Sequence, residues 1–133
     1  MRAFYWVQAG RSAAGIGQRV ACFCTALESL FATSSVELTH QLAERTAIFL
    51  AEESNRREEI YRQVKRAYGV RSKVIHGEVI RQSRTSELIM ASQECDGLLR
   101  EVIQKVVGDR EARATFDGTN DRIDRYFLQL LFK

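Results

Sequence analysis

No proline occurs anywhere in the 133 residues of this chain. Proline removes a backbone donor and clashes inside helices, so its absence leaves long helices unbroken. From residue 16 onward apolar residues recur at steps of three and four, the period of a helix with one buried face, and no convincing strand alternation follows residue 15. The sequence therefore predicts an all-α fold, a compact helical bundle of about five to six helices.

Glycines and short polar stretches mark the ends of the expected helices. Ser34 with Glu37 three residues later matches a capping box, Gly69 ends or bends a helix, and Gly108-Asp109 ends another. The predicted helices span residues 16–32, 34–52, 54–68, 71–81, 83–107 and 121–131, the last after a polar connection. Together they form one domain over residues 16–133.

Residues 1–15 have a different composition. The aromatic run Phe4-Tyr5-Trp6 is followed by a stretch rich in glycine and alanine. An aromatic run followed by such a stretch is typical of an extended segment and a loop. We therefore expect an extended N-terminal arm, either a remnant of a larger protein or a segment that packs on a neighbour.

Charge and cysteine content limit the classes of protein to which the chain can belong. The net charge of +3 permits a polyanionic partner without requiring one. Cys22, Cys24 and Cys95 lack the spacing of a zinc site, so we expect reduced thiols packed as small hydrophobic groups in a cytoplasmic protein. The apolar runs are shorter than a membrane span, and no signal peptide is apparent. Neither a metal nor a cofactor is expected.

Arg71 and His76 are the candidate catalytic pair. A guanidinium binds phosphate with two donors, and an imidazole titrates near neutrality and can move a proton. If a helix begins at this point, its unpaired N–H groups also favour an anion. Five residues apart in a helix, the two side chains point about 140° away from each other, whereas Ser72 and His76 share a face. The alternative is a surface arginine and a histidine with a structural role, and spacing alone leaves this alternative open.

The segment Arg71-Ser72-Lys73-Val74-Ile75-His76-Gly77 resembles the Arg-polar-x-x-x-His signature of HEPN domains. These are helical domains named for nucleotide binding in higher eukaryotes and prokaryotes. Three further blocks are similar to the Apea-like branch of that superfamily: Ala26–Phe31, Glu37–Arg45, and Ile60-Tyr61 with Tyr68-Gly69-Val70. The resemblance as a whole covers about residues 16–133.

The resemblance implies a HEPN-like bundle that forms a homodimer, with the signature residues of both protomers facing one cleft. Many such domains are metal-independent endoribonucleases in toxin–antitoxin, phage-defence or RNA-processing systems. Arg71 would then bind phosphate, His76 would act as acid and base, and Ser72 would help orient the site. An antitoxin or a larger defence protein is a candidate partner. Some toxin relatives have a modifiable Tyr two residues after the His, where this chain has Glu78.

Other HEPN relatives only bind nucleotides or RNA, so a non-catalytic binding or dimerisation module is the alternative function. Two residues carry separate expectations: Glu28 either holds Arg71 by a charge pair or pairs locally, and His40 pairs with Glu44 one helical turn later. Four basic residues either extend an RNA track or belong to a solvated helix face. They are Arg62, Lys65, Arg66 and Lys73.

Overall fold

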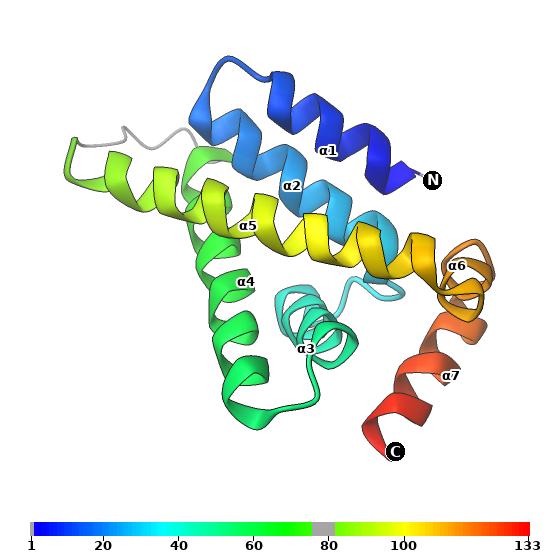
Figure 1. The fold of residues 1–133 in the computed structure, drawn as a ribbon. Helices are drawn as coiled ribbons and strands as arrows, with labels where there is room; N and C mark the ends of the chain where they lie inside the picture. The colour runs from blue at the N-terminus through cyan, green and yellow to red at the C-terminus, as the bar shows by residue number, and fades with distance from the viewer. Residues whose placement is uncertain (1, 76–81) are drawn as a thin grey trace.

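The computed structural model describes residues 2–75 and 82–133, and all regular secondary structure in these two ranges is helical (Figure 1). The described residues form the helices α1 (Arg2–Ser12), α2 (Ile16–Phe31), α3 (Leu38–Leu50), α4 (Ser54–Ile75), α5 (Gln82–Gly108), α6 (Arg110–Phe116) and α7 (Asn120–Leu131). The predicted all-α bundle is confirmed. Among the described residues, no helix has both the length and the apolar character needed to cross a membrane.

Helix α2 lies at the centre of the bundle and contacts α1, α3, α4 and α5 (Figure 1). Every position that the sequence assigned to its apolar face is buried. These positions are Val20, Phe23, Cys24, Leu27, Leu30 and Phe31. Steps of three and four put these side chains on one face of α2, and that face is buried among the neighbouring helices.

An aromatic cluster joins the C-terminal part of the chain to this core. The ring of Phe31 on α2 lies 5.6 Å from Phe49 of α3, 5.4 Å from Phe116 of α6 and 5.6 Å from Phe127 of α7. Tilted and edge-to-face pairs of this kind add about 0.5–1.5 kcal/mol each beyond the area they bury. Helices α6 and α7 are therefore part of the same core as α2 and α3.

The N-terminal segment is a helix, and the expectation of an extended arm is wrong. Helix α1 packs along α2 (Figure 1), with Ala3, Val7 and Gly10 buried on its inner face. A Cβ atom at Gly10 would lie 2.6 Å from Cε1 of Phe23, so the missing side chain permits the close approach of the two helices. Of the small residues interpreted as a loop, Gly10 lies inside α1 and packs against α2, whereas residues 13–15 do form the connection between the two helices.

Two more expectations about helix ends are corrected. Helix α4 runs from Ser54 to Ile75, so Gly69 does not end it. Ser34 and Glu37 do not form a capping box, because Glu37 adopts a left-handed φ of 49° and the Ser34 hydroxyl accepts from the Val36 amide instead. For Gly69, the cost of a glycine inside a helix is only about 1 kcal/mol relative to alanine, and the buried neighbours Tyr68 and Val70 hold α4 together across it.

Helix α6 occupies part of the segment expected to be an irregular polar connection. Asp109 caps it by accepting hydrogen bonds from the amides of Glu111 and Ala112 at 2.9 and 3.3 Å. Ala112 and Thr115 are buried on its inner face. These residues are too small and too polar to give a clear apolar period, which explains why the sequence pattern did not reveal a helix here.

Candidate functional site

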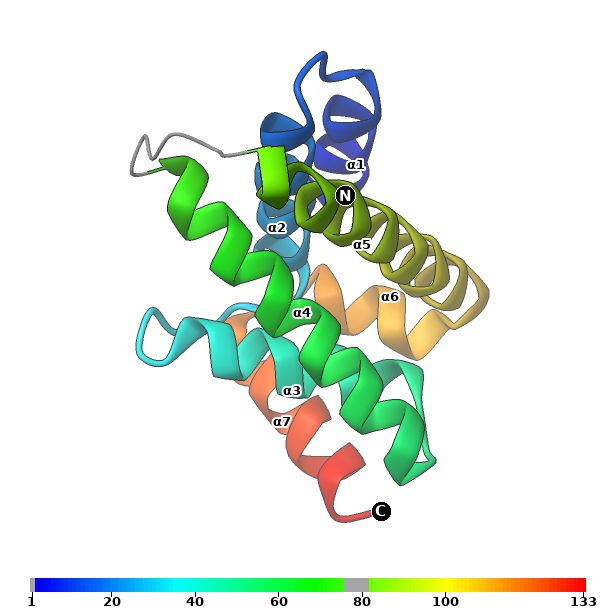
Figure 2. The same cartoon turned by 90° about the vertical axis from the view of Figure 1, so that its left-hand side faces the viewer.

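Helix α4 passes α2 (Figure 2), and the side chains of Arg71 on α4 and Glu28 on α2 meet there. Nη1 of Arg71 lies 3.1 Å from Oε1 of Glu28, and each side chain is 25% exposed. Of the two alternatives for Glu28, a charge pair with Arg71 or a local pair, the structure contains the charge pair. Because it is only partly exposed, solvent screens it less than a surface pair.

Tyr68 completes this cluster from the turn of α4 that precedes Arg71. Its hydroxyl lies 3.0 Å from Oε1 of Glu28 and 3.0 Å from the carbonyl oxygen of Cys24, with one proton to donate to these two acceptors. The guanidinium carbon of Arg71 lies 5.4 Å from the centre of the Tyr68 ring. Burial, then the neighbouring Cys24 and Glu28, raise the pKa of the Tyr68 hydroxyl well above its usual range, so it stays protonated and donates.

The carboxylate and the ring fix the Arg71 guanidinium on two sides. Its Nε atom is buried and has no hydrogen-bond partner among the described residues. A guanidinium carries five N–H donors, and the pair with Glu28 uses the Nη1 end. The cluster therefore presents an oriented, partly buried cation at the surface between α2 and α4.

The backbone around Arg71 does not form the expected anion site at a helix start. Arg71 belongs to the last turns of α4, which ends at Ile75. Inside a helix the backbone N–H groups are bonded to carbonyl groups four residues earlier. Any anion at this place is bound by the Arg71 side chain and gains nothing from helix N–H groups.

The other residues of the signature are described only in part. Ser72 is exposed on α4 next to Arg71. His76 and the side chain of Lys73 lie outside the described residues. The contacts described for this segment are those of Arg71 with Glu28 and Tyr68.

Carboxylates neutralise much of the basic face of α4. Arg62 pairs with Glu58 at 2.6 Å, and Arg66 pairs with Glu94 of α5 at 2.9 Å. Lys65 instead places its Nζ 5.8 Å from the centre of the Tyr61 ring. The interpretation of a solvated helix face fits Arg62 and Arg66, while Lys65 keeps a charge that no described carboxylate pairs with within 4 Å.

His40 lies on α3 in a second polar cluster. Its Nε2 is 3.1 Å from Oε2 of Glu44, so the expected local pair is present, and its Nδ1 is 2.9 Å from the Tyr61 hydroxyl of α4. The sequence did not predict the contact with Tyr61, because it depends on how α3 crosses α4. The spacing of one helical turn between His40 and Glu44 is the only signal that the sequence contains for this cluster.

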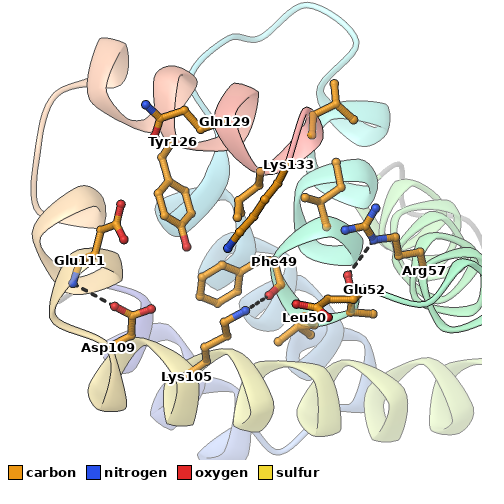
Figure 3. Close-up of a pocket in the computed structure, with 14 residues that line it drawn as sticks. Phe49, Leu50, Glu52, Arg57, Lys105, Asp109, Glu111, Tyr126, Gln129 and Lys133 are labelled. Atoms are coloured by element: carbon orange, nitrogen blue, oxygen red, sulfur yellow. Dashed lines mark hydrogen bonds between the residues drawn. The ribbon is translucent and has the colours of Figure 1, made fainter.

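A pocket of about 730 Å³ lies away from both clusters, between the C-terminal ends of α3 and α5 and the helix α7 (Figure 3). Lys105 donates to the carbonyl of Phe49 on its wall, and Arg57 donates to the carbonyl of Ala51 at 2.7 Å. The residues that line it come from five parts of the chain, so no local sequence pattern indicates it. Tyr126 and Lys133 point toward its interior in Figure 3.

Cys24 and Cys95 are buried and unpaired, as predicted for thiols that pack as small hydrophobic groups, and Cys22 is half-buried. Burial raises the pKa of the Cys95 thiol to about 12 and that of Cys24 above its usual range. Among residues 2–75 and 82–133, no group of three potential ligands lies close enough to hold a metal ion.

Comparisons with models of protein families, with curated proteins and with solved structures find no match.

Proposed function

We propose that the chain is a metal-independent endoribonuclease of the HEPN type, which cleaves RNA in a cleft shared by two protomers. The observation that carries the proposal is the oriented guanidinium of Arg71. A cation fixed by Glu28 and Tyr68 loses little conformational freedom when a phosphate binds to it. The residue is also the first member of the Arg71–His76 signature.

In the proposed reaction, a ribose 2′-OH attacks the adjacent phosphorus atom. His76 takes the proton from the 2′-OH or gives one to the 5′ oxygen that leaves. Arg71 binds the nonbridging phosphate oxygens and offsets the negative charge that grows during attack. Glu28 acts as a positioning residue, because it contacts Arg71 rather than the substrate. The products are a 2′,3′-cyclic phosphate and a free 5′-OH.

The angle between the signature side chains supports a homodimer. In a regular helix the two side chains point about 140° apart, which disfavours binding of one phosphate by both from a single helix. A second protomer would supply the missing group across a two-fold axis. RNA is the proposed ligand, in the cytoplasm and in a toxin–antitoxin or phage-defence setting.

A non-catalytic module that binds RNA or a nucleotide is the second candidate. The observation that favours it is the existing pair between Arg71 and Glu28, since a carboxylate at 3.1 Å competes with an incoming phosphate. The ion pairs of Arg62 and Arg66 reduce the positive charge available to a long RNA strand, so within this candidate they favour a nucleotide or a short RNA as the ligand.

Cleavage of single-stranded RNA by the purified protein in EDTA separates the two candidates. The first predicts cleavage that Arg71→Ala and His76→Ala each reduce by about 10²–10⁴-fold. Arg100→Ala is the matched control, because Arg100 is an exposed arginine that pairs with Asp96 on α5. Binding without cleavage favours the second candidate, and the absence of both binding and cleavage contradicts the two together.

Glu28→Gln tests the positioning role in the same assay. Glutamine keeps an oxygen that accepts from Tyr68 but loses the charge that holds Arg71. We expect kcat to fall about tenfold while KM changes little, because the guanidinium is less well aimed in the transition state. Unchanged kcat with a lower unfolding midpoint would show that Glu28 serves stability alone.

A further inference from the structure

Helices α3 and α4 lie side by side (Figure 2), and across their contact an ion-pair contact links Glu44 to His40 and a hydrogen bond links His40 to Tyr61. Oε2 of Glu44 lies 3.1 Å from Nε2 of His40, and Nδ1 of His40 lies 2.9 Å from the Tyr61 hydroxyl. The side chains of His40 and Glu44 are 53% and 45% exposed, and Tyr61 is half-buried, so small molecules can reach the chain from solvent.

The neighbours of His40 favour one of its two neutral tautomers. A carboxylate only accepts hydrogen bonds, so Glu44 beside Nε2 favours the tautomer with the proton on that nitrogen. This tautomer has its lone pair on Nδ1, which can accept the hydrogen bond from the Tyr61 hydroxyl. This arrangement has the order of an orienting carboxylate, a base and a hydroxyl nucleophile, each within hydrogen-bond reach of the next.

Lys65 adds a positive charge beside the same tyrosine. Its Nζ lies 5.8 Å from the centre of the Tyr61 ring, one turn further along α4. A cation over the ring face stabilises the phenolate more than the neutral phenol. The base and the cation therefore act in the same direction on the Tyr61 oxygen.

We propose that Tyr61 is an activated nucleophile that accepts an acyl group from an activated ester. In the step, the Tyr61 oxygen attacks the carbonyl carbon while its proton passes to Nδ1 of His40, and Glu44 stabilises the imidazolium. The bond from the carbonyl carbon to the leaving oxygen breaks, and an alcohol or phenol departs as its anion, with the imidazolium proton returned to solvent. The product is an O-acyl tyrosine.

This site is separate from the cluster at Arg71. Tyr61 and Arg71 are ten residues apart on the same helix, which corresponds to about 15 Å along the axis. The activity of Tyr61 therefore does not depend on the proposed cleavage of RNA, and either can fail without the other.

The chain contains its own reference for the test, because its four tyrosines differ in exposure. Tyr5 is 65% exposed, whereas Tyr68 and Tyr126 are buried at 7% and 8%. Exposure alone predicts that Tyr5 reacts before the half-buried Tyr61. Treatment with p-nitrophenyl acetate, followed by peptide mass spectrometry, should instead show Tyr61 acetylated at least about tenfold faster than Tyr5, the lower part of what general-base assistance supplies.

Variants at Glu44, His40 and Tyr61 complete the design. His40→Gln and Glu44→Gln should bring the acetylation rate of Tyr61 down to that of Tyr5 or below. Tyr61→Phe should remove the fast release of p-nitrophenolate, and Tyr5→Phe should leave it unchanged. Equal rates at Tyr5 and Tyr61, or no effect of Glu44→Gln in a protein with a wild-type circular dichroism spectrum, overturn the proposal. Fast release that persists in Tyr61→Phe overturns it too, since His40 would then be the nucleophile.

Discussion

Arg45 connects three segments of the chain through one guanidinium. Its Nη1 donates to the Phe31 carbonyl at 2.8 Å and to Oγ1 of Thr33 at 3.0 Å, and its Nη2 donates to Asp124 of α7 at 2.6 Å. The group also lies 5.1 Å from the centre of the Phe127 ring. One side chain thus holds the connection between α2 and α3 against α7.

Asp124 gives this junction a pH dependence. Hydrogen bonds from Thr33 and then from Arg45 hold the pKa of the Asp124 carboxyl below its usual 3.8. A folded-state pKa below the unfolded one stabilises the fold above the unfolded value, and the contribution is lost as pH falls through the folded-state pKa. The contribution stays below about 1 kcal/mol, because Asp124 is half exposed.

Asp124→Asn should therefore lower the urea midpoint at about pH 7 and have a smaller effect at about pH 2.5. The measurement is a pair of urea titrations of the wild type and the variant at both pH values. Asp121→Asn, on the exposed first turn of the same helix, is the control for a general change of charge. A difference between wild type and Asp124→Asn that is equal at both pH values would assign the effect to packing.

At the Arg71 cluster, residue chemistry predicted one contact and missed another. The charges of Glu28 and Arg71 gave reason to expect their pairing, because opposite charges on adjacent helices attract whatever the detailed packing. Tyr68 could not be predicted as their partner, since the position of its hydroxyl near Cys24 and Glu28 depends on the crossing of α2 and α4. Helix periodicity places Tyr68 inward but does not say which polar groups it meets.

At the scale of elements, glycine was the least reliable signal in the sequence. Gly10 and Gly69 were both interpreted as breaks in regular structure, yet both lie inside helices. They differ in their surroundings: a Cβ at Gly10 would collide with the Phe23 ring, while nothing lies within 4 Å of a Cβ at Gly69. A local pattern cannot distinguish a glycine required by packing from one that packing merely tolerates.

This difference predicts opposite effects of the same substitution. Gly69→Ala should stabilise the protein by about 0.5–1 kcal/mol, because alanine favours helix and meets open space. Gly10→Ala should destabilise it by about 1–2 kcal/mol, because the overpacking against the buried Phe23 outweighs the gain in helix propensity. Urea unfolding of both variants measures the two changes. Stabilisation by Gly10→Ala would show that α1 shifts easily along α2.

For the whole molecule, the buried face of each long helix determined most of the fold. The apolar stripe of α2 was correct at every position, and this helix organises the four helices around it. What the sequence could not supply are the angles at which helices cross. Those angles create the chain from Glu44 to Tyr61 and the pocket beside Phe49, both of which combine residues from distant parts of the sequence.

The proposed dimer makes a prediction that concerns two copies of the chain together. If Arg71 of one protomer works with His76 of its partner, a heterodimer of Arg71→Ala and His76→Ala keeps one intact pair and loses the other. Co-expression with two different tags and sequential purification isolates this heterodimer. It should cleave RNA at about half the wild-type rate, whereas each variant homodimer should be inactive.

The alternative outcomes locate the proposed site within one chain or between two. A heterodimer as inactive as the homodimers would mean that Arg71 and His76 act from the same protomer, and the shared cleft would be wrong. Failure to recover any heterodimer, with a monomeric mass in light scattering, would remove the dimer itself. Glu28 contacts Arg71 within one protomer. In an active heterodimer, Glu28→Gln should therefore lower the cleavage rate when it is placed in the His76→Ala protomer, which keeps Arg71, and have no effect in the Arg71→Ala protomer. That asymmetry would identify the protomer that supplies the guanidinium in the active heterodimer.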